Sequence, residues 1–93
     1  MQTYYFVYIL FSHKDKKIYI GYSTDLKKRI KRHISGKVPA TKKRRPLELI
    51  HYEVFKNKKD AKAREIYLKS GNGRKQLKQS IKNLLTKLNY NYL

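Results

Sequence analysis

The sequence predicts an α+β fold: a three-stranded antiparallel sheet flanked by helices, with elements in the order β-β-α-β-α-α. Two observations predict it. Runs rich in aromatic and β-branched residues, which are typical of strands, occur at 4–11, 18–22 and 47–55. Apolar residues recur at helical spacing in much of the remaining chain. A chain of 93 residues is enough for one small domain, so residues 1–93 are expected to form a single unit.

The first two runs are expected to form an antiparallel hairpin. The run at 4–11 is apolar on both faces, as in a buried strand, and a short polar turn connects it to 18–22. Alternation of side chains places Tyr8 and Tyr19 on one face of this hairpin. Gly21 inside the second strand predicts a bulge or a close approach to the backbone.

A first helix is expected after the hairpin, with Ser23 or Thr24 as its N-cap and Gly36 at its end. One face of this helix carries residues at helical spacing: Leu26, Ile30, His33 and Ile34. Both prolines and a basic run fall within 37–46, which is therefore predicted to be a loop. In the third strand, alternation predicts one shared face for three residues: Ile50, Tyr52 and Val54.

Two more helices are predicted near the C-terminus. Asn57 followed by Asp60 resembles a capping box at the start of the second helix. The tripeptide Gly-Asn-Gly at 71–73 is a strong helix breaker and is expected to end it. From 74 to 89, apolar residues recur at helical spacing with lysines on the opposite face. This range is therefore predicted to form one amphipathic helix.

The chain is strongly basic. It contains 24 Lys and Arg against 6 Asp and Glu, a formal net charge of +18. Self-repulsion of this size opposes the compact state, so a polyanionic partner is expected, and nucleic acid is the commonest one. A solvated, lysine-rich surface is the alternative interpretation. The chain has no cysteine, which excludes disulfides and thiolate zinc sites.

No association with a membrane is expected. The longest apolar run, at 4–11, is far shorter than the roughly 20 residues that a spanning helix needs. The same run lacks the basic flank and the small-residue cleavage site of a signal peptide. We therefore expect a cytoplasmic protein and, given its size, a monomer.

Five side chains could act together in metal-assisted cleavage of a phosphodiester: Tyr8, Tyr19, Arg29, His33 and Glu65. Arg29 and His33 are four positions apart and hence neighbours on the first helix. Glu65 falls on the apolar face of the second helix, where an unpaired carboxylate is costly, so it should have a cation or a metal ion. As alternatives, the two tyrosines could be core residues, and Glu65 could form an ion pair with Lys62 or Lys69.

Four segments carry a resemblance to a known family: Val7-Tyr8-Ile9-Leu10, Tyr19-Ile20-Gly21, Asp-Leu-Lys-Lys-Arg at 25–29 followed by His33, and 61–69 with Glu65. In this order and spacing they resemble a GIY-YIG nuclease domain of the small standalone bacterial type. The chain is similar to the N-terminal catalytic module of the GIY-YIG nuclease of bacterial excision repair, and the resemblance covers nearly all of it. It implies the same α+β fold.

The resemblance also implies roles. Tyr8 corresponds to the tyrosine proposed as general base, and Tyr19 to the one that positions water or phosphate. Arg29 would bind the scissile phosphate, and His33 would touch phosphate or the tyrosine hydroxyl. Glu65 would be the single carboxylate ligand of Mg²⁺ or Mn²⁺. Because tyrosine has a reference pKa of about 10, the cations nearby are expected to favour its phenolate.

Two departures from the family pattern stand out. Phe6 occupies the position of the glycine in the first signature. The asparagine that the family often carries beyond the glutamate is not at its usual spacing. Asn72 is the nearest candidate, but it is expected to be a turn residue.

The resulting hypothesis is a divalent-metal-dependent DNA endonuclease that nicks one strand, as in DNA repair, recombination or the movement of mobile elements. RNA stays open as a substrate. Phosphate-binding residues are expected on the first helix and in the loop: Lys28, Arg32, Lys42, Lys43, Arg44 and Arg45. The alternatives are a non-catalytic nucleic-acid-binding protein that retains the nuclease fold and a structural RNA-associated protein.

Overall fold

A three-stranded antiparallel sheet forms the centre of the structure, a computed structural model that describes residues 3–92. Strand β1 (Tyr5–Ser12) lies between β2 (Ile18–Ser23) and β3 (Leu47–Phe55) and pairs antiparallel with both. All three predicted strands are therefore confirmed, and their boundaries differ from the prediction by one residue at most.

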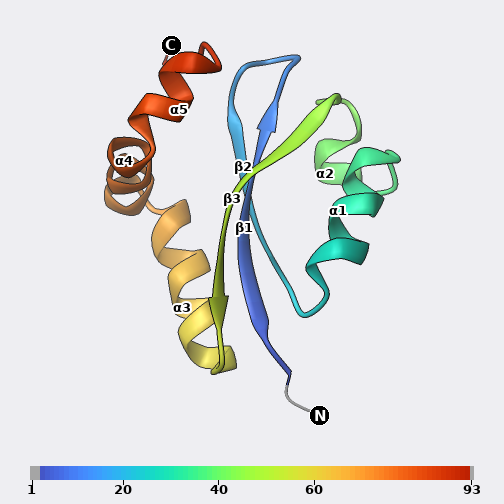
Figure 1. Cartoon of the computed structure of the whole chain (residues 1–93), viewed down its shortest axis with the longest axis vertical. Coiled ribbons are helices and arrows are strands. Elements are labelled where there is room, and N and C mark those ends of the chain that lie inside the picture. The colour runs from blue at the N-terminus through green and yellow to red at the C-terminus, as the bar shows by residue number, and fades with distance from the viewer. Residues whose placement is uncertain (1–2, 93) are drawn as a thin grey trace.

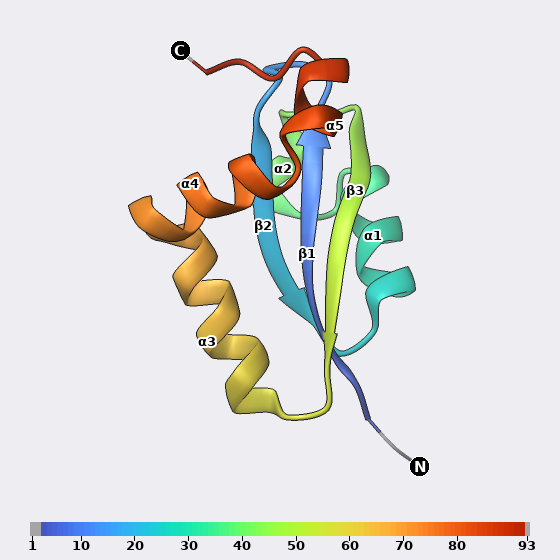
Figure 2. The same cartoon turned by 60° about the vertical axis from the view of Figure 1, so that its left-hand side comes forward.

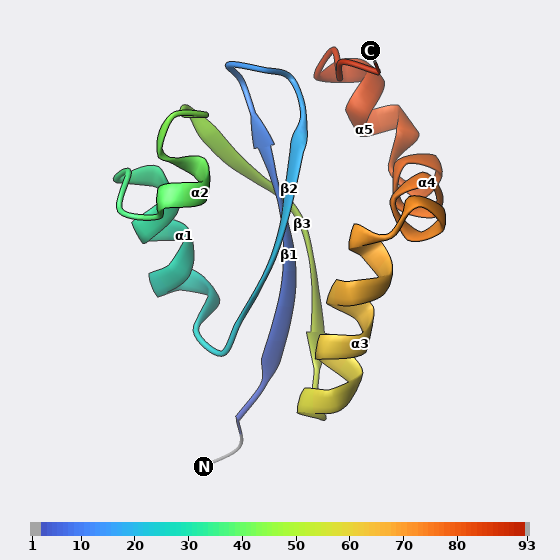
Figure 3. The ribbon, with the colours of Figure 1, turned by 180° about the vertical axis from the view of Figure 1, so that it is seen from behind.

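Helices cover both faces of this sheet (Figure 1). In chain order they are α1 (Leu26–Ile34), α2 (Pro39–Lys42), α3 (Lys58–Lys69), α4 (Gly71–Ser80) and α5 (Lys82–Lys87). Helices α1 and α2 lie on one side of the sheet and the other three lie on the opposite side, as the view from behind also shows (Figure 3). The predicted α+β fold is confirmed. Within residues 3–92, no helix combines the length and apolar character needed to cross a membrane.

Each face of the sheet buries its own hydrophobic cluster because side chains alternate along β1. On the α3 side, Val7, Ile9 and Phe11 pack with Leu68 of α3 and Leu77 of α4. The cluster on the α1 side contains Tyr8, Leu10 and Leu47 with the partly buried Tyr19, Leu26, Ile30 and Leu49. Burial of one such side chain contributes about 1.5–3 kcal/mol, so these clusters hold the helices against the sheet.

Asp25 caps α1, so the prediction of Ser23 or Thr24 as its N-cap is wrong. The Oδ1 atom of Asp25 accepts a hydrogen bond from the backbone N–H of Lys28 at 3.1 Å. The Ser23 hydroxyl accepts one from the Asp25 N–H at 3.0 Å and thus fixes the turn that precedes the helix. Gly36, with a φ of 78°, follows the end of α1 as predicted.

Helix α3 ends at Lys69, directly before the tripeptide at 71–73, as predicted. The tripeptide forms the first turn of α4, so Asn72 is a helix residue and not the expected turn residue. Ser70 caps α4, because its Oγ accepts a hydrogen bond from the Gly73 N–H at 3.1 Å. A side chain at Gly73 would collide with the Tyr67 carbonyl, so glycine permits the sharp change of direction between α3 and α4 (Figure 2). Asn57 begins α3 as predicted and accepts two backbone N–H bonds.

The continuous helix predicted for 74–89 is two helices, which break at Ile81. The Ser80 hydroxyl donates a hydrogen bond to the Leu77 carbonyl at 2.8 Å. Bonds of this type compete with the backbone ladder and bend helices. At this break the Ile81 side chain packs against the hydrophobic cluster on the α3 side.

A β-bulge separates Ile50 from Tyr52. The pairing of β1 with β3 shifts register between Ile9 and Leu10. Ile50 packs against the cluster on the α3 side, whereas Tyr52 lies on the α1 face beside Phe6, with the two ring centroids 6.5 Å apart. The prediction that Ile50 and Tyr52 share a face is therefore wrong, because a bulge inserts one residue into the alternation.

Candidate active site

Gly21 allows the Tyr8 side chain to take its position. The two residues lie directly opposite each other in the pairing of β1 with β2. A Cβ atom at Gly21 would overlap the phenol of Tyr8, so the ring occupies the space that the glycine leaves open. Tyr8 is fully buried, at 0% exposure. The predicted close approach at Gly21 is thus confirmed, and a side chain makes it.

The Tyr8 hydroxyl contacts two side chains of α1. It lies 2.7 Å from Nε2 of His33 and accepts a hydrogen bond from Nε of Arg29 at 3.4 Å. The His33 ring also packs between two tyrosine rings, with centroids 5.5 Å from Tyr8 and 5.3 Å from Tyr19. The structure therefore brings four of the five predicted catalytic residues together on the α1 side of the sheet.

Thr41 extends this network, although no motif or spacing in the sequence pointed to it directly. Its hydroxyl lies 2.7 Å from Nδ1 of His33, and both side chains are fully buried. Thr41 belongs to α2, within the range predicted to be a loop. One indication of helix α2 was present in the sequence, namely Pro39, because proline is common at the first position of a helix. One tautomer of His33 satisfies the three side chains. In it the Tyr8 hydroxyl donates to Nε2 of His33, and the Nδ1–H of His33 donates to the Thr41 hydroxyl.

Burial shifts the pKa values of this pair in opposite directions. Burial raises the pKa of Tyr8 above 10.0, and the charges of Tyr19 and Glu65 add to it, while Arg29 acts in the opposite direction. Burial, helped by the Arg29 charge, lowers the pKa of His33 from 6.5 to about 4. The expected effect of Arg29, which favours the phenolate, is confirmed, but burial outweighs it, and the expected contribution of a metal ion stays a prediction. At neutral pH the pair consists of a phenol and a neutral imidazole.

His33 should make the folded protein less stable as the pH falls. The imidazole takes up a proton near pH 6.5 in the unfolded chain but only near pH 4 in the folded one. Between these values the unfolded state binds more protons, so the free energy of unfolding falls with pH, by about 3 kcal/mol at most. Urea unfolding from neutral pH down to about 4.5 measures this loss.

Two variants test the assignment. His33→Asn should flatten the decline, whereas His13→Asn, which changes a surface pair with Glu48, should keep it. Asp15 and Glu53 have lowered pKa values, so they affect stability only at lower pH. A decline in His33→Asn as steep as in the wild type would contradict a buried, neutral imidazole.

Glu65 lies on α3, the helix that covers the other face of the sheet. Its side chain is 14% exposed and forms ion pairs with Lys69, at 2.9 Å, and with Lys62, at 3.7 Å. Helix α3 packs against β2, and Glu65 is close enough for its charge to raise the pKa of Tyr8. The predicted cationic partners of Glu65 are therefore these two lysines, and the carboxylate lies across the β2 edge from the tyrosine–histidine pair.

The side chains of the site could hold a metal ion only through the single carboxylate of Glu65. Among residues 3–92, no group of three or more His, Asp and Glu side chains could hold an ion. Mg²⁺ keeps several waters and is often held by one or two carboxylates plus substrate phosphates. Glu65 therefore fits an ion that arrives with its substrate, provided that Lys69 moves away from the carboxylate.

A basic groove follows the exposed edge of β2. We call it the β2-edge groove; it has a volume of about 500 Å³ and is lined by Asp15, Lys17, Ile18, Tyr19, Ile20, Arg44, Lys69 and Arg74. Tyr19 thus contacts His33 and also lines this groove. Lys69 and Arg74 were not among the predicted phosphate-binding residues, because only the fold of α3 and α4 brings them to the β2 edge.

The predicted phosphate-binding residues differ in their surroundings. Lys28, Arg32, Lys42 and Lys43 are exposed. Arg45 is also exposed, and its Nε donates to the Lys42 carbonyl at 3.1 Å. Arg44 is bound to Asp15, with 2.6 Å between Nε and Oδ2, and to the Ile18 carbonyl at 3.3 Å. Arg44 therefore has a structural role that ties α2 to β2. Asn72 does not line the β2-edge groove.

The family model described as the GIY-YIG catalytic domain matches residues 4–79. This chain belongs to the GIY-YIG family. The match includes Tyr8, Tyr19, Arg29, His33 and Glu65, all of which lie within these residues. The fold is consequently of the nuclease type, as the resemblance implied.

Several proteins that carry the name UPF0213 are similar to this chain. The UPF0213 protein YsiG of Lactococcus lactis is 46% identical over 84 residues, which cover 89% of this chain and 80% of that protein. A UPF0213 protein of Pediococcus acidilactici is 38% identical over 77 residues, which cover 80% of this chain and 78% of that protein. A UPF0213 protein of Haloquadratum walsbyi is 37% identical over 71 residues, which cover 75% of this chain and 79% of that protein. No solved structure matches the chain significantly.

Proposed function

We propose that this GIY-YIG protein is a divalent-metal-dependent endonuclease that nicks DNA at the site around Tyr8. The observation that carries the proposal is the Tyr8 hydroxyl, which lies between a neutral His33 and the Arg29 guanidinium. A water activated there would attack a phosphate bound to Arg29. The net charge of +18 and the β2-edge groove supply the attraction for a polyanion.

The pair of pKa values determines how the proton moves. Direct transfer from Tyr8 to His33 is unfavourable in the free protein, since burial raises the pKa of the phenol and lowers that of the imidazole. Phosphate bound to Arg29 would offset the charge that helps to depress the pKa of His33. The imidazole then becomes a better acceptor, and Tyr8 passes its proton to Nε2. The resulting phenolate takes a proton from the attacking water, whose oxygen bonds to phosphorus as the P–O bond to the leaving oxygen breaks. Thr41 holds the imidazole in the required orientation.

Glu65 and Tyr19 complete the proposed site. A divalent ion bound by Glu65 would stabilise negative charge on the phosphate and on the leaving group. The carboxylate must leave Lys69, whose ammonium group is then available to a neighbouring phosphate in the β2-edge groove. Tyr19 borders both His33 and this groove, and it would orient the scissile phosphate.

The second candidate is a nucleic-acid-binding protein that retains the fold without cleavage. One observation favours it: Glu65 already has two lysine partners, and no group of three metal-ligating side chains occurs among residues 3–92. An RNA substrate, a cytoplasmic location, a monomeric state and a role in DNA repair stay predictions.

Removal of the metal separates the two candidates. Purified protein should convert supercoiled plasmid to open circles in Mg²⁺ or Mn²⁺, and excess EDTA should stop this conversion while DNA binding persists. The substrate is followed on agarose gels and binding by a mobility shift in the same buffers. Binding without any conversion in either metal would support the non-catalytic candidate, and conversion in EDTA would contradict the role of the metal.

A further inference from the structure

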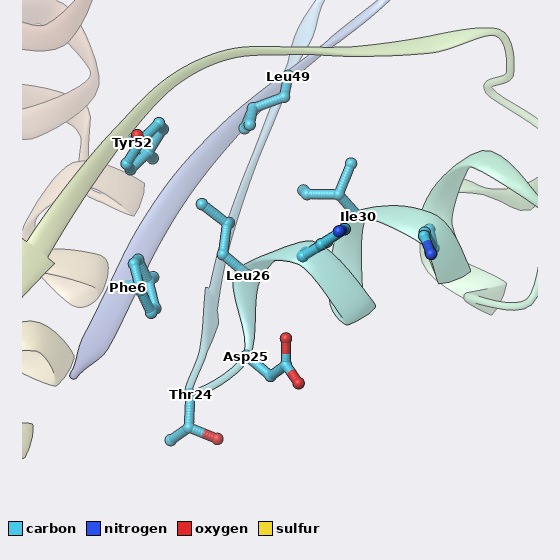
Figure 4. A pocket seen from close by; sticks show the side chains of 9 residues that line it. Phe6, Thr24, Asp25, Leu26, Ile30, Leu49 and Tyr52 are labelled. Atoms are coloured by element: carbon cyan, nitrogen blue, oxygen red, sulfur yellow. The ribbon is translucent and has the colours of Figure 1, made fainter. Parts of the chain in front are cut away.

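A second hollow lies on the α1 face, beside the hydrophobic cluster that contains Tyr8. We call it the apolar groove, and it has a volume of about 710 Å³. Its apolar lining comes from α1, β1 and β3 (Figure 4): Phe6, Leu26, Ile30, Leu49 and Tyr52. The polar residues of the lining are Thr24, Asp25, Lys27 and Lys31.

One apolar residue of this lining, Tyr52, is largely accessible to solvent, at 51% exposure. Val54, next but one on β3 and outside the groove, is 50% exposed. Tyr52 contacts Phe6 at a tilt of 55°, which leaves a large part of its ring uncovered. Exposed aromatic surface beside a hollow is unfavourable in water and is typical of binding sites.

The apolar groove and the Tyr8 site are neighbours on the side of α1 that faces the sheet. Arg29 and His33 face the Tyr8 hydroxyl, whereas Leu26 and Ile30 line the apolar groove. Lys27 and Lys31 also line the groove. Nucleic acid that contacts α1 can therefore reach both hollows.

We propose that the apolar groove binds an unpaired nucleobase of the substrate, with the adjoining phosphates on Lys27 and Lys31. The proposal rests on nucleic acid being the substrate, as proposed above. A base is flat and apolar on its faces and stacks on aromatic side chains, and its phosphates are anionic. The groove offers the complementary set, an aromatic floor beside two ammonium groups. The Asp25 carboxylate repels a bound phosphate less than an unpaired carboxylate would, because it caps α1 and accepts a backbone hydrogen bond there.

A substrate with a single-stranded segment follows from this proposal. Bases of an intact duplex are stacked and paired, so they cannot enter the groove without the cost of unstacking. The protein should therefore bind single-stranded DNA, or duplex with an unpaired overhang, more tightly than blunt duplex. Such DNA would also be cut in preference if the Tyr8 site cleaves.

Fluorescence anisotropy in EDTA, where cleavage is excluded, tests the groove independently of the nuclease. Tyr52→Ala should weaken binding of a labelled single-stranded oligonucleotide by roughly 5- to 100-fold and leave the affinity for blunt duplex nearly unchanged. Tyr52→Phe keeps the ring and should bind like the wild type. Tyr67→Ala removes an exposed tyrosine of α3 and should change neither affinity. Quenching of 2-aminopurine in the same oligonucleotide should be lost with Tyr52→Ala.

Several outcomes would overturn the proposal. Unchanged binding of single strands by Tyr52→Ala, or an equal loss for single strands and duplex, would exclude base stacking. If the wild type forms a concentration-dependent dimer in sedimentation and the only effect of Tyr52→Ala is the loss of this dimer, the groove binds a second copy of the chain and not a nucleobase. If Tyr52→Ala unfolds, Tyr52→Thr, which suits a strand, replaces it. If the wild type binds bases in the groove but does not nick plasmid, only the proposed nuclease activity is rejected. If the wild type nicks plasmid and Tyr52→Ala keeps the wild-type affinity for single strands, only the proposed base site is rejected.

Discussion

Glu65→Gln is expected to abolish nicking while DNA binding is kept or becomes tighter. Glutamine keeps the shape of the side chain but removes the charge that would hold a divalent ion. Loss of the ion removes stabilisation of the phosphate worth several kcal/mol, so the rate should fall by about 100-fold or more. Binding depends on many basic residues, and deletion of one negative charge beside phosphate should not weaken it. The measurements are nicking rate and affinity in one Mn²⁺ buffer.

Folding of this variant and a matched control can be checked directly. Glu65 loses ion pairs with Lys62 and Lys69, which at partly exposed positions contribute about 1 kcal/mol or less each. Glu53→Gln also removes a carboxylate paired with an arginine, at 2.9 Å from Arg64, and should nick normally. A Glu65→Gln protein that cleaves at the wild-type rate would show that Glu65 is not the metal ligand and that the proposed mechanism is wrong.

Tyr8→Phe is expected to lower the nicking rate by about 100- to 10,000-fold, the range for loss of a general base. The ring keeps its place beside Gly21 and in the cluster on the α1 side. Only the hydroxyl that contacts His33 and Arg29 is lost. Because Nε2 of His33 then lacks its partner, the free energy of unfolding should fall by about 1–3 kcal/mol. Single-turnover cleavage with saturating protein measures the chemical step.

Tyr22→Phe is the control for the loss of a tyrosine hydroxyl from the hairpin. The Tyr22 hydroxyl is buried and makes no hydrogen bond to any residue in the described range 3–92. Its removal should therefore leave nicking unchanged and should not destabilise the protein. Equal rates for Tyr8→Phe and the wild type would place the chemistry outside the Tyr8–His33 pair.

Elements with a repeated local pattern were predictable from the sequence. The strands alternate or are apolar throughout, and α3 begins at a residue whose side chain caps the backbone, so the three strands and the Asn57 cap agree with the structure. The β-bulge at Ile50 was not predictable because a single inserted residue leaves no periodic signal. Helix α2 has only four residues, too few for a hydrophobic period.

The candidate site was predictable where a motif carries its residues. Tyr8, Tyr19, Arg29 and His33 were named from the resemblance, and alternation on the hairpin already placed the two tyrosines together. Thr41 was missed because its role depends on a contact made between α1 and α2. The net direction of the Tyr8 pKa shift depends on burial, which no pattern in the sequence quantifies.

The most direct test of a DNA-cleaving site at Tyr8 is the rate of plasmid nicking in Mg²⁺ by three proteins prepared in parallel. These are the wild type, Tyr8→Phe and Tyr22→Phe, purified from one host so that any contaminating nuclease is common to all. The structure predicts that the wild type and Tyr22→Phe produce open circles at the same rate and that Tyr8→Phe produces almost none. Equal nicking by all three, or none by the wild type in Mg²⁺ or Mn²⁺, would contradict an endonuclease site at Tyr8.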